Sequence, residues 1–272
     1  MRVTILGDHF VRTDLCRAAL RRLVGPLVEQ WRIRSMEVDW PDTPLRHNAE
    51  VAEYVGDPHE IAAFAGNSEV IITHVAPVTA AVIAASPQLR LIGCTRGGPV
   101  NVNLAAASAR RVPVVNAPGR NAQAVIEFTL GLILAEYRGI GRAHGALASG
   151  AWQGELYRYE RTGRELRGQT IGLIGFGAIG QGLIPYLKPF DLRILVHDPY
   201  VDPALLAQLA VETVDLPTLL AESDIVSLHA RVTAQTTGLL DAAQFAQVKR
   251  GAFLINTARG PLVDYEALYH AL

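Results

Sequence analysis

Short apolar runs alternate with stretches of helical periodicity through the first part of the chain. The apolar runs predict strands at 3–6, 32–38, 70–73, 90–93 and 112–115, and the periodic stretches predict helices near 13–23, 57–65, 79–85 and 104–110. Strands that alternate with helices are typical of a parallel sheet with helices on its faces. We therefore expect residues 1–117 to form one α/β domain.

The same alternation resumes near residue 170. Apolar runs predict strands at 170–174, 193–196, 211–214, 224–228 and 252–256, with helical segments at 217–221, 241–247 and 265–272. Asp264 stands where the last helix needs an N-cap. Proline and glycine punctuate 116–121, which predicts a crossing between domains, so we expect residues 118–272 to form the second one.

The segment 123–147 carries more apolar positions than one helix face can hold. We predict one long helix there, buried on several sides against another domain or another subunit. The polar and aromatic stretch 152–167 is expected to be an irregular connection back to the second sheet.

Three glycines follow the strand predicted at 170–174. Gly175, Gly177 and Gly180 have G-x-G-x-x-G spacing, and a helical segment and a second strand come after them. In dinucleotide-binding proteins the first glycine permits a tight turn, the second lets backbone approach a pyrophosphate, and the third lets helix and strand pack closely. An α/β crossover without a ligand is the alternative, but the order of elements favours dinucleotide binding.

Asp198 ends the second strand of this unit. A carboxylate at that place can accept hydrogen bonds from a ribose diol, and it would repel a 2′-phosphate. The expected cofactor is therefore NAD rather than NADP.

Composition limits the class of protein. Half of the 272 residues are hydrophobic and the formal net charge is −1, as in a soluble globular protein with a substantial core. No basic patch indicates nucleic acid or an anionic membrane as a partner. The apolar stretch 124–137 is too short to cross a bilayer. Cys16 and Cys94 form neither a disulfide framework nor a metal-ligand cluster, which indicates the reducing cytoplasm and no metal site.

Open parallel sheets bind ligands at the carboxyl ends of their strands. Arg96, Gly97 and Gly98 follow the strand at 90–93, and a fixed cation beside flexible N–H groups can hold a carboxylate or phosphate. The alternative is a glycine turn with a solvent-facing arginine. His74 is predicted to be a hydrogen-bonded histidine near a strand end rather than a catalyst, and residues 7–9 are predicted to be only a turn.

His229 and Arg259 come at the carboxyl ends of two strands of the second sheet. The neighbours of Arg259 are small, so its planar guanidinium has room to hold a carboxylate through two parallel hydrogen bonds. Beside a nicotinamide it would orient a 2-keto acid and stabilise charge on the carbonyl oxygen during hydride transfer. The alternative is a structural arginine that bonds loop carbonyls.

A series of motifs resembles one family, the D-isomer-specific 2-hydroxyacid dehydrogenases. They are LIGCTRGGPVNVNLAAA (91–107), NAPGRNAQAVIEFTLGLIL (116–134), IGLIGFGAIG (171–180), VHDP (196–199), SDIVSLHARVTAQTTGLL (223–240) and GAFLINTARGPLVDYEAL (251–268). The resemblance implies NAD-dependent hydride transfer on a small 2-hydroxy or 2-keto acid. It also implies two Rossmann-like parallel-sheet domains, with the NAD domain inserted into a flavodoxin-like substrate domain, and a homodimer formed through the NAD domains.

The resemblance assigns roles to residues of this chain. Arg259 matches the catalytic, carboxylate-binding arginine, and Gly97 and Gly98 match contacts to substrate or nicotinamide. The residues that match the cofactor site are Gly175, Gly177, Ala178, Ile179, Gly180, Asp198, His229, Ala230, Thr257 and Ala258.

Three arginines are further candidates. Arg96 stands in the substrate loop where many family members have small residues, Arg120 follows the domain crossing, and Arg231 adds positive charge near the cofactor or substrate. For Arg96 and Arg120 we hypothesise a more acidic or phosphorylated substrate, as in phosphoglycerate dehydrogenases. The alternative for Arg231 is a solvent-facing side chain.

Family members use a histidine, tuned by a glutamate, as general acid and base, and both lie beyond the motif of Arg259. Neither is within the 272 residues, so we expect the natural protein to continue past Leu272 and to return there to the substrate domain. Other classes stay open: an NAD-sensing binding protein without turnover, like the C-terminal binding protein corepressors, or an inactive fragment or dimer that merely retains NAD.

Overall fold

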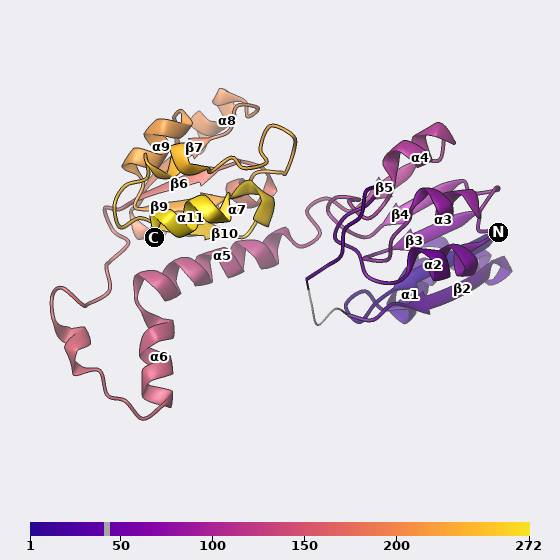
Figure 1. Cartoon of the computed structure of the whole chain (residues 1–272), viewed down its shortest axis with the longest axis horizontal. Helices are drawn as coiled ribbons and strands as arrows, with labels where there is room; N and C mark the ends of the chain where they lie inside the picture. Colours follow the sequence, from indigo (N-terminus) through magenta and orange to yellow (C-terminus); the bar gives the residue numbers. More distant parts are fainter. Residues whose placement is uncertain (41–43) are drawn as a thin grey trace. The chain divides into compact units, whose positions relative to one another are not determined.

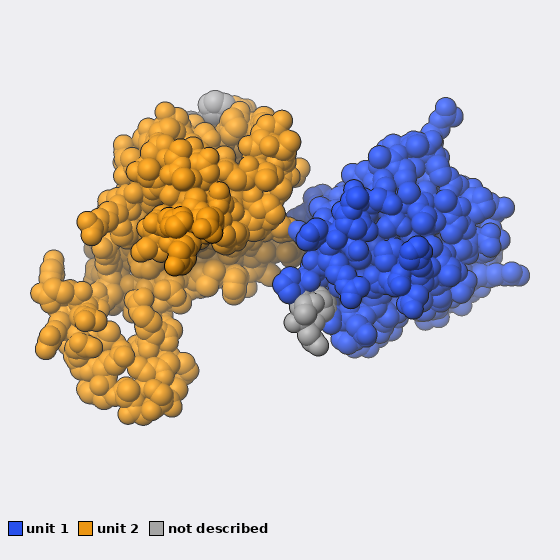
Figure 2. Space-filling view, viewed as in Figure 1, with its two compact units in different colours: residues 1–120 blue, residues 121–272 orange. Residues whose placement is uncertain are grey.

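The computed structural model describes residues 1–40 and 44–272. Over these residues the chain divides into two compact units, Met1–Arg120 and Asn121–Leu272 (Figure 2). Each unit is built on one parallel five-stranded sheet with helices between its strands. The predicted α/β architecture of two Rossmann-like parallel sheets is therefore confirmed.

The first unit has the strand order of flavodoxin. Its strands lie in the order β2-β1-β3-β4-β5, with the bounds β1 (Arg2–Gly7), β2 (Arg32–Glu37), β3 (Val70–Thr73), β4 (Leu91–Cys94) and β5 (Val114–Asn116). The helices between them are α1 (Thr13–Val24), α2 (Pro58–Ala65), α3 (Ala80–Ala84) and α4 (Leu104–Ala109), with a 3-10 helix at Gly25–Gln30. The strand order changes direction between β1 and β3, the switch point at which open α/β sheets bind ligands.

The second unit has the Rossmann strand order. Its sheet runs β10-β9-β6-β7-β8, with the bounds β6 (Thr170–Ile174), β7 (Arg193–His197), β8 (Glu212–Thr213), β9 (Ile225–Leu228) and β10 (Phe253–Asn256). Its helices are α5 (Ala122–Tyr137), α6 (Ile140–Ala148), α7 (Ala178–Leu187), α8 (Pro203–Gln208), α9 (Leu216–Glu222), α10 (Ala242–Phe245) and α11 (Tyr265–Ala271), with 3-10 helices at Gly154–Tyr157, Lys188–Phe190 and Gly260–Leu262. The switch point here lies between β6 and β9.

Burial of the central strands on both faces explains why they are mostly apolar. β9 is buried along its whole length, and β6 is buried except at its first residue. In the first unit, Ile5 of β1, Ile71 of β3 and Ile92 of β4 are completely buried. Helices cover both faces of a parallel sheet, so its strands lack the polar alternation of a half-exposed strand.

The single helix predicted at 123–147 is wrong, because the chain forms two helices there. α5 ends at Tyr137 and α6 begins at Ile140. Between them Gly139 adopts a left-handed conformation with φ of 63°, which a glycine reaches without the steric cost of a Cβ. α6 consequently leaves the direction of α5 (Figure 1). Within residues 1–40 and 44–272 no helix is long and apolar enough to cross a membrane.

Candidate functional site

The turn between β6 and α7 requires glycine at its first position. Gly175 has φ of +94°, and a Cβ placed on it would lie 2.6 Å from the backbone nitrogen of Ala230. The turn therefore lies directly against the loop after β9, across the switch point of the second sheet. Gly180 is close-packed as well, since its Cβ would lie 2.6 Å from the carbonyl oxygen of Gly175.

Gly177 is different, because it faces open space. A Cβ there would have no atom within 4 Å, and Gly177 is the N-cap of the ten-residue helix α7. No side chain makes a capping hydrogen bond at this end of α7. The N–H groups of its first turn, at Ala178 and Ile179, are therefore available to a phosphate together with the positive end of the helix dipole.

Asp198 is held beside the glycine turn by two backbone hydrogen bonds. One carboxylate oxygen accepts from the N–H of Phe176 at 2.7 Å, and the other accepts from the N–H of Tyr200 at 2.9 Å. A carboxylate has about four acceptor positions, so both oxygens keep capacity for the hydroxyls of a ribose. The glycine turn, the end of α7 and Asp198 thus fit a dinucleotide.

His229 lies at the end of β9, on the other side of the same switch point. Its Nε2 is 2.9 Å from the hydroxyl of Ser227. Its Nδ1 is buried and has no hydrogen-bond partner among the described residues. Burial lowers the pKa of His229 to about 4, so the ring is neutral near pH 7. A buried ring nitrogen without a partner beside Ala230 and the glycine turn also fits a bound polar ligand.

The loop after β10 is fixed by Thr257 and Asn256. The hydroxyl of Thr129 in α5 donates to the carbonyl of Val125 at 2.8 Å, so in its 2.9 Å contact with Thr257 it accepts. The side chain of Asn256 accepts from the N–H of Ala258 and donates to the carbonyl of Arg259. These bonds present Thr257 and Ala258 at the carboxyl edge of the second sheet.

Arg259 is exposed at the end of this loop. Its Nη1 donates to the carbonyl of Ala258 at 2.8 Å. That bond matches the structural alternative for this arginine, and the bidentate contact to a carboxylate stays a prediction. Arg231, in the loop after β9, is exposed too, and its carbonyl accepts from the hydroxyl of Thr236 at 2.6 Å.

At the carboxyl edge of the first sheet, Arg96 is buried rather than solvent-facing. It is only 9% exposed. Its guanidinium donates to the backbone carbonyl of Glu53 at 2.6 Å and pairs with the carboxylate of the same residue. Arg96 thus fastens the loop that contains Glu53, and a substrate contact for it stays a prediction. Gly97 and Gly98 border open space, since a Cβ on either would meet no atom within 4 Å.

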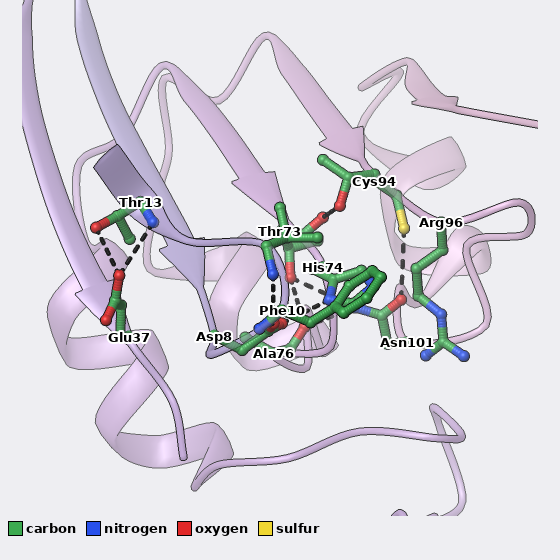
Figure 3. Close-up of polar contacts among 12 residues, drawn as sticks. Asp8, Phe10, Thr13, Glu37, Thr73, His74, Ala76, Cys94, Arg96 and Asn101 are labelled. Atoms are coloured by element: carbon green, nitrogen blue, oxygen red, sulfur yellow. Dashed lines mark hydrogen bonds and ion pairs between the residues drawn. The ribbon is translucent and has the colours of Figure 1, made fainter. Parts of the chain in front are cut away.

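Asn101 is a buried polar residue at the carboxyl edge of the first sheet that sequence reasoning missed. It is completely buried. Its amide donates to the carbonyl of Ala76 at 2.7 Å, and its oxygen lies 3.5 Å from the thiol of Cys94 (Figure 3). Asn101 therefore ties the loop after β3 to the end of β4. Nothing in its sequence neighbourhood distinguishes it from an ordinary loop asparagine.

Asp8 was predicted to be part of a turn only, and it does more. It accepts from the N–H groups of Phe10 and Val11 at 2.8 Å, as a turn aspartate does. Its other oxygen lies 2.6 Å from Nδ1 of His74 (Figure 3). Nε2 of His74 lies 2.8 Å from Nη2 of Arg120. The prediction that His74 is hydrogen-bonded is thus met at both ring nitrogens. Its position directly after a strand was the available signal for Asp8.

Comparison with known proteins places this geometry in a family. Residues 130–272 match the family described as D-isomer specific 2-hydroxyacid dehydrogenase, NAD binding domain. The D-3-phosphoglycerate dehydrogenase of Mycobacterium tuberculosis is 36% identical over 237 residues, which are 87% of this chain and 42% of that protein. The hydroxypyruvate reductase of Thermotoga maritima is 38% identical over 199 residues, 73% of this chain and 63% of that protein.

A solved structure agrees over nearly the whole chain. The D-lactate dehydrogenase of Aquifex aeolicus, complexed with NAD and lactic acid, superposes with a TM-score of 0.77 at 25% identity, over 99% of this chain and 72% of that one. This chain spans less than two thirds of the length of either sequence relative. The chain belongs to the D-isomer-specific 2-hydroxyacid dehydrogenase family, and residues 130–272 are its NAD-binding domain.

Proposed function

We propose that this protein transfers a hydride between NAD and C2 of a small 2-hydroxy or 2-keto acid. The observation that carries the proposal is the second sheet, where a glycine turn fitted to a dinucleotide and Arg259 both follow carboxyl ends of strands. Relatives named phosphoglycerate dehydrogenase, hydroxypyruvate reductase and glyoxylate reductase support the substrate class. Whether the acid is phosphorylated, as 3-phosphoglycerate is, belongs to this proposal.

In this proposal the second unit binds and orients the cofactor. The pyrophosphate lies on Gly175, Gly177 and the first turn of α7 (Ala178, Ile179), with Gly180 keeping that helix close to the sheet. Asp198 accepts from the adenosine ribose. His229, Ala230, Thr257 and Ala258 form the wall toward the nicotinamide. When bound, NAD supplies the hydride acceptor.

Arg259 binds the substrate carboxylate through its planar fork and stabilises negative charge on the C2 oxygen. An arginine side chain does not act as a proton acceptor, so the hydroxyl proton must go to a group other than Arg259. Gly97 and Gly98, whose surroundings are open, have backbone N–H groups that suit the contact to substrate or nicotinamide implied by the family resemblance.

We also propose a homodimer and a cytoplasmic location. Exposed apolar side chains gather on α5, α6 and the segment after them, namely Phe128, Ile140, Leu147, Trp152, Tyr157 and Tyr159, which suits contact with a second copy of the chain. Cys16 and Cys94 are both unpaired, as expected in a reducing compartment.

The test uses the full-length natural protein with NADH and a panel of 2-keto acids. Arg259→Gln should lower kcat/KM by roughly a hundredfold or more, because a charged bidentate contact to the carboxylate and the carbonyl oxygen is lost. Arg259→Lys keeps the charge without the fork and should recover part of the loss. The Kd for NADH should stay within about twofold in both variants, because the proposed contact of Arg259 is to the substrate. Measuring NADH binding and kcat/KM together therefore separates loss of the substrate contact from loss of the cofactor site.

The alternative class makes the opposite prediction. A wild-type protein that binds NADH tightly but reduces none of hydroxypyruvate, glyoxylate, pyruvate and phosphohydroxypyruvate would contradict the enzyme proposal. That result would favour the NAD-sensing binding protein.

A further inference from the structure

The switch point of the first sheet carries a chain of three polar side chains. Asp8 follows β1, His74 follows β3, and these two strands are neighbours at the point where the strand order reverses. Arg120 follows β5 and completes the chain through Nε2 of His74. Open α/β sheets bind ligands at this place. The three hydrogen-bonded side chains, Asp8, His74 and Arg120, are therefore at the position of a binding site.

The hydrogen bonds fix the protonation of His74. An arginine carries donors only, so Nε2 of His74 must accept the 2.8 Å bond from Arg120. The ring proton is then on Nδ1, which donates to Asp8 at 2.6 Å. Burial would raise the pKa of Asp8, but the hydrogen bonds from His74 and from the N–H of Val11 outweigh it and hold that pKa below its ordinary value. The three hydrogen-bonded side chains are therefore a carboxylate, a neutral imidazole and a guanidinium, in that order.

Asp8 and His74 are buried, whereas Arg120 is exposed. The guanidinium of Arg120 also lies over the ring of Phe10, 5.5 Å from its centroid. One N–H is committed to His74, and no carboxylate of the described residues pairs with the others. Arg96 contrasts with it, since its guanidinium is buried against Glu53. Of these two arginines, Arg120 is the exposed one.

Aromatic side chains surround the histidine. Phe10 and Trp40 stack on His74 with ring centroids 5.7 and 6.5 Å away. Both rings are large apolar groups left exposed, at 62% and 46%. Apolar walls lower the local dielectric and so strengthen an ion pair formed beside them. A fixed cation next to exposed aromatic walls is suited to an anionic group of a small ligand.

We propose that Arg120 binds a carboxylate or phosphate that the substrate carries in addition to its 2-keto acid carboxylate. Asp8 and His74 are positioning residues: Asp8 holds the proton on Nδ1, and His74 orients the guanidinium through Nε2. The other neutral tautomer would place an N–H against Arg120 and push it away. This proposal rests on the proposed function, because it names a second group on the same substrate.

The first experiment compares substrates in the full-length protein. Phosphohydroxypyruvate and oxaloacetate carry a second anionic group, and hydroxypyruvate carries none. Arg120→Gln should lower kcat/KM for the first two by tenfold or more, mainly through KM, and for hydroxypyruvate by less than about threefold. Arg90→Gln is the matched control: it removes the same charge from an exposed residue before β4, at the opposite edge of the sheet, and should change neither.

Two substitutions of His74 test the positioning role. His74→Gln can still accept from Arg120 and donate to Asp8, so it should keep most of the preference for doubly anionic substrates. His74→Leu can do neither and should lose that preference as Arg120→Gln does. Equal losses in the two His74 variants, with matching losses on hydroxypyruvate, would show a merely structural role and overturn the assignment.

A binding measurement separates this proposal from the proposed function. Calorimetric titration of the NADH complex with tartronate, which has two carboxylates, and with D-lactate, which has one, needs no turnover. Arg120→Gln should weaken tartronate about tenfold or more and lactate less than threefold. If that difference appears but no 2-keto acid is turned over, the enzyme proposal fails and the anion-binding role of Arg120 is supported. If tartronate and lactate lose equally, or neither binds the wild type, the role of Arg120 is overturned.

Discussion

His229 is a partly exposed histidine whose ring is desolvated enough to be held in the neutral state. Its pKa lies near 4 because burial penalises the charged ring. The unfolded chain takes up a proton on this residue at its ordinary pKa near 6.5, and the folded chain does not. The free energy of unfolding should therefore fall as pH drops from about 6.5 to about 4, by roughly 3 kcal/mol, with no contribution above that window.

Urea unfolding at pH 7.5 and 4.5 measures this difference. His229→Gln removes the titration and should flatten the dependence between those pH values, whatever it does to stability at pH 7.5. An unchanged slope in His229→Gln would contradict the neutral state of the histidine.

Asp8 affects stability in a different pH range. Its pKa is lowered in the folded state, so the stability that it contributes is present above its ordinary pKa of 3.8 and is lost as pH falls below that value.

Single residues were predictable from the sequence where one strand end was enough to place them. Asp198 directly follows β7 and Arg259 lies in the loop after β10, so both are at carboxyl ends of strands, as predicted. The partner of Arg96 was not predictable, because Glu53 lies 43 positions away. Asp8 and His74 are 66 positions apart. Such pairs depend on which strands are neighbours in the sheet, and local spacing does not carry that information.

Two glycines of the turn between β6 and α7 have different surroundings, since Gly175 is close-packed and Gly177 faces open space. Alanine at the two positions should therefore have different effects on stability and NADH binding. Gly175→Ala combines φ of +94° with a Cβ 2.6 Å from backbone, and should destabilise the protein by about 3 kcal/mol or more. Gly177→Ala meets open space and should change stability by no more than about 1 kcal/mol. It should nevertheless weaken NADH binding about tenfold or more, because its methyl group would stand where the proposed function places the pyrophosphate.

Urea unfolding and NADH fluorescence titration, made on the same preparations, give the two readouts. If Gly177→Ala kept both wild-type stability and wild-type NADH affinity, the N-terminal end of α7 would not be part of the cofactor site. Stability loss in Gly177→Ala as large as in Gly175→Ala would mean that the glycines serve packing alone.

At the scale of elements, β3 and β6 have the predicted bounds, because β-branched and aliphatic residues stand at both ends of each strand. β5 begins two residues later than predicted, after Pro113, which cannot donate to the ladder. The helix predicted at 123–147 failed at Gly139. Apolar periodicity continues across that glycine, so the pattern does not reveal that the backbone there is left-handed.

At the scale of the whole chain, the α/β class followed from the alternation of strands and helices, but the strand orders did not. Periodicity cannot distinguish β2-β1-β3-β4-β5 from other parallel orders. Only the family resemblance implied a flavodoxin-like and a Rossmann-like sheet. The orders matter because each switch point joins distant segments: Gly175 to Ala230 in one sheet, and Asp8 to His74 in the other.

The apolar surface of α5, α6 and the segment after them gives the last prediction, the homodimer. In Figure 1 α6 and this segment extend away from the sheet of their own unit. Leu147 on α6 is 61% exposed, and Leu23 on α1 of the first unit is 77% exposed.

If a second copy covers the apolar surface of α6, Leu147→Arg buries an unpaired charge in the interface. The variant should then sediment as a monomer in a sedimentation-velocity experiment. Leu23→Arg adds the same charge elsewhere and should leave the dimer intact. A wild-type protein that sediments as a monomer at tens of micromolar, or equal behaviour of the two variants, would assign these apolar side chains to something other than a second copy.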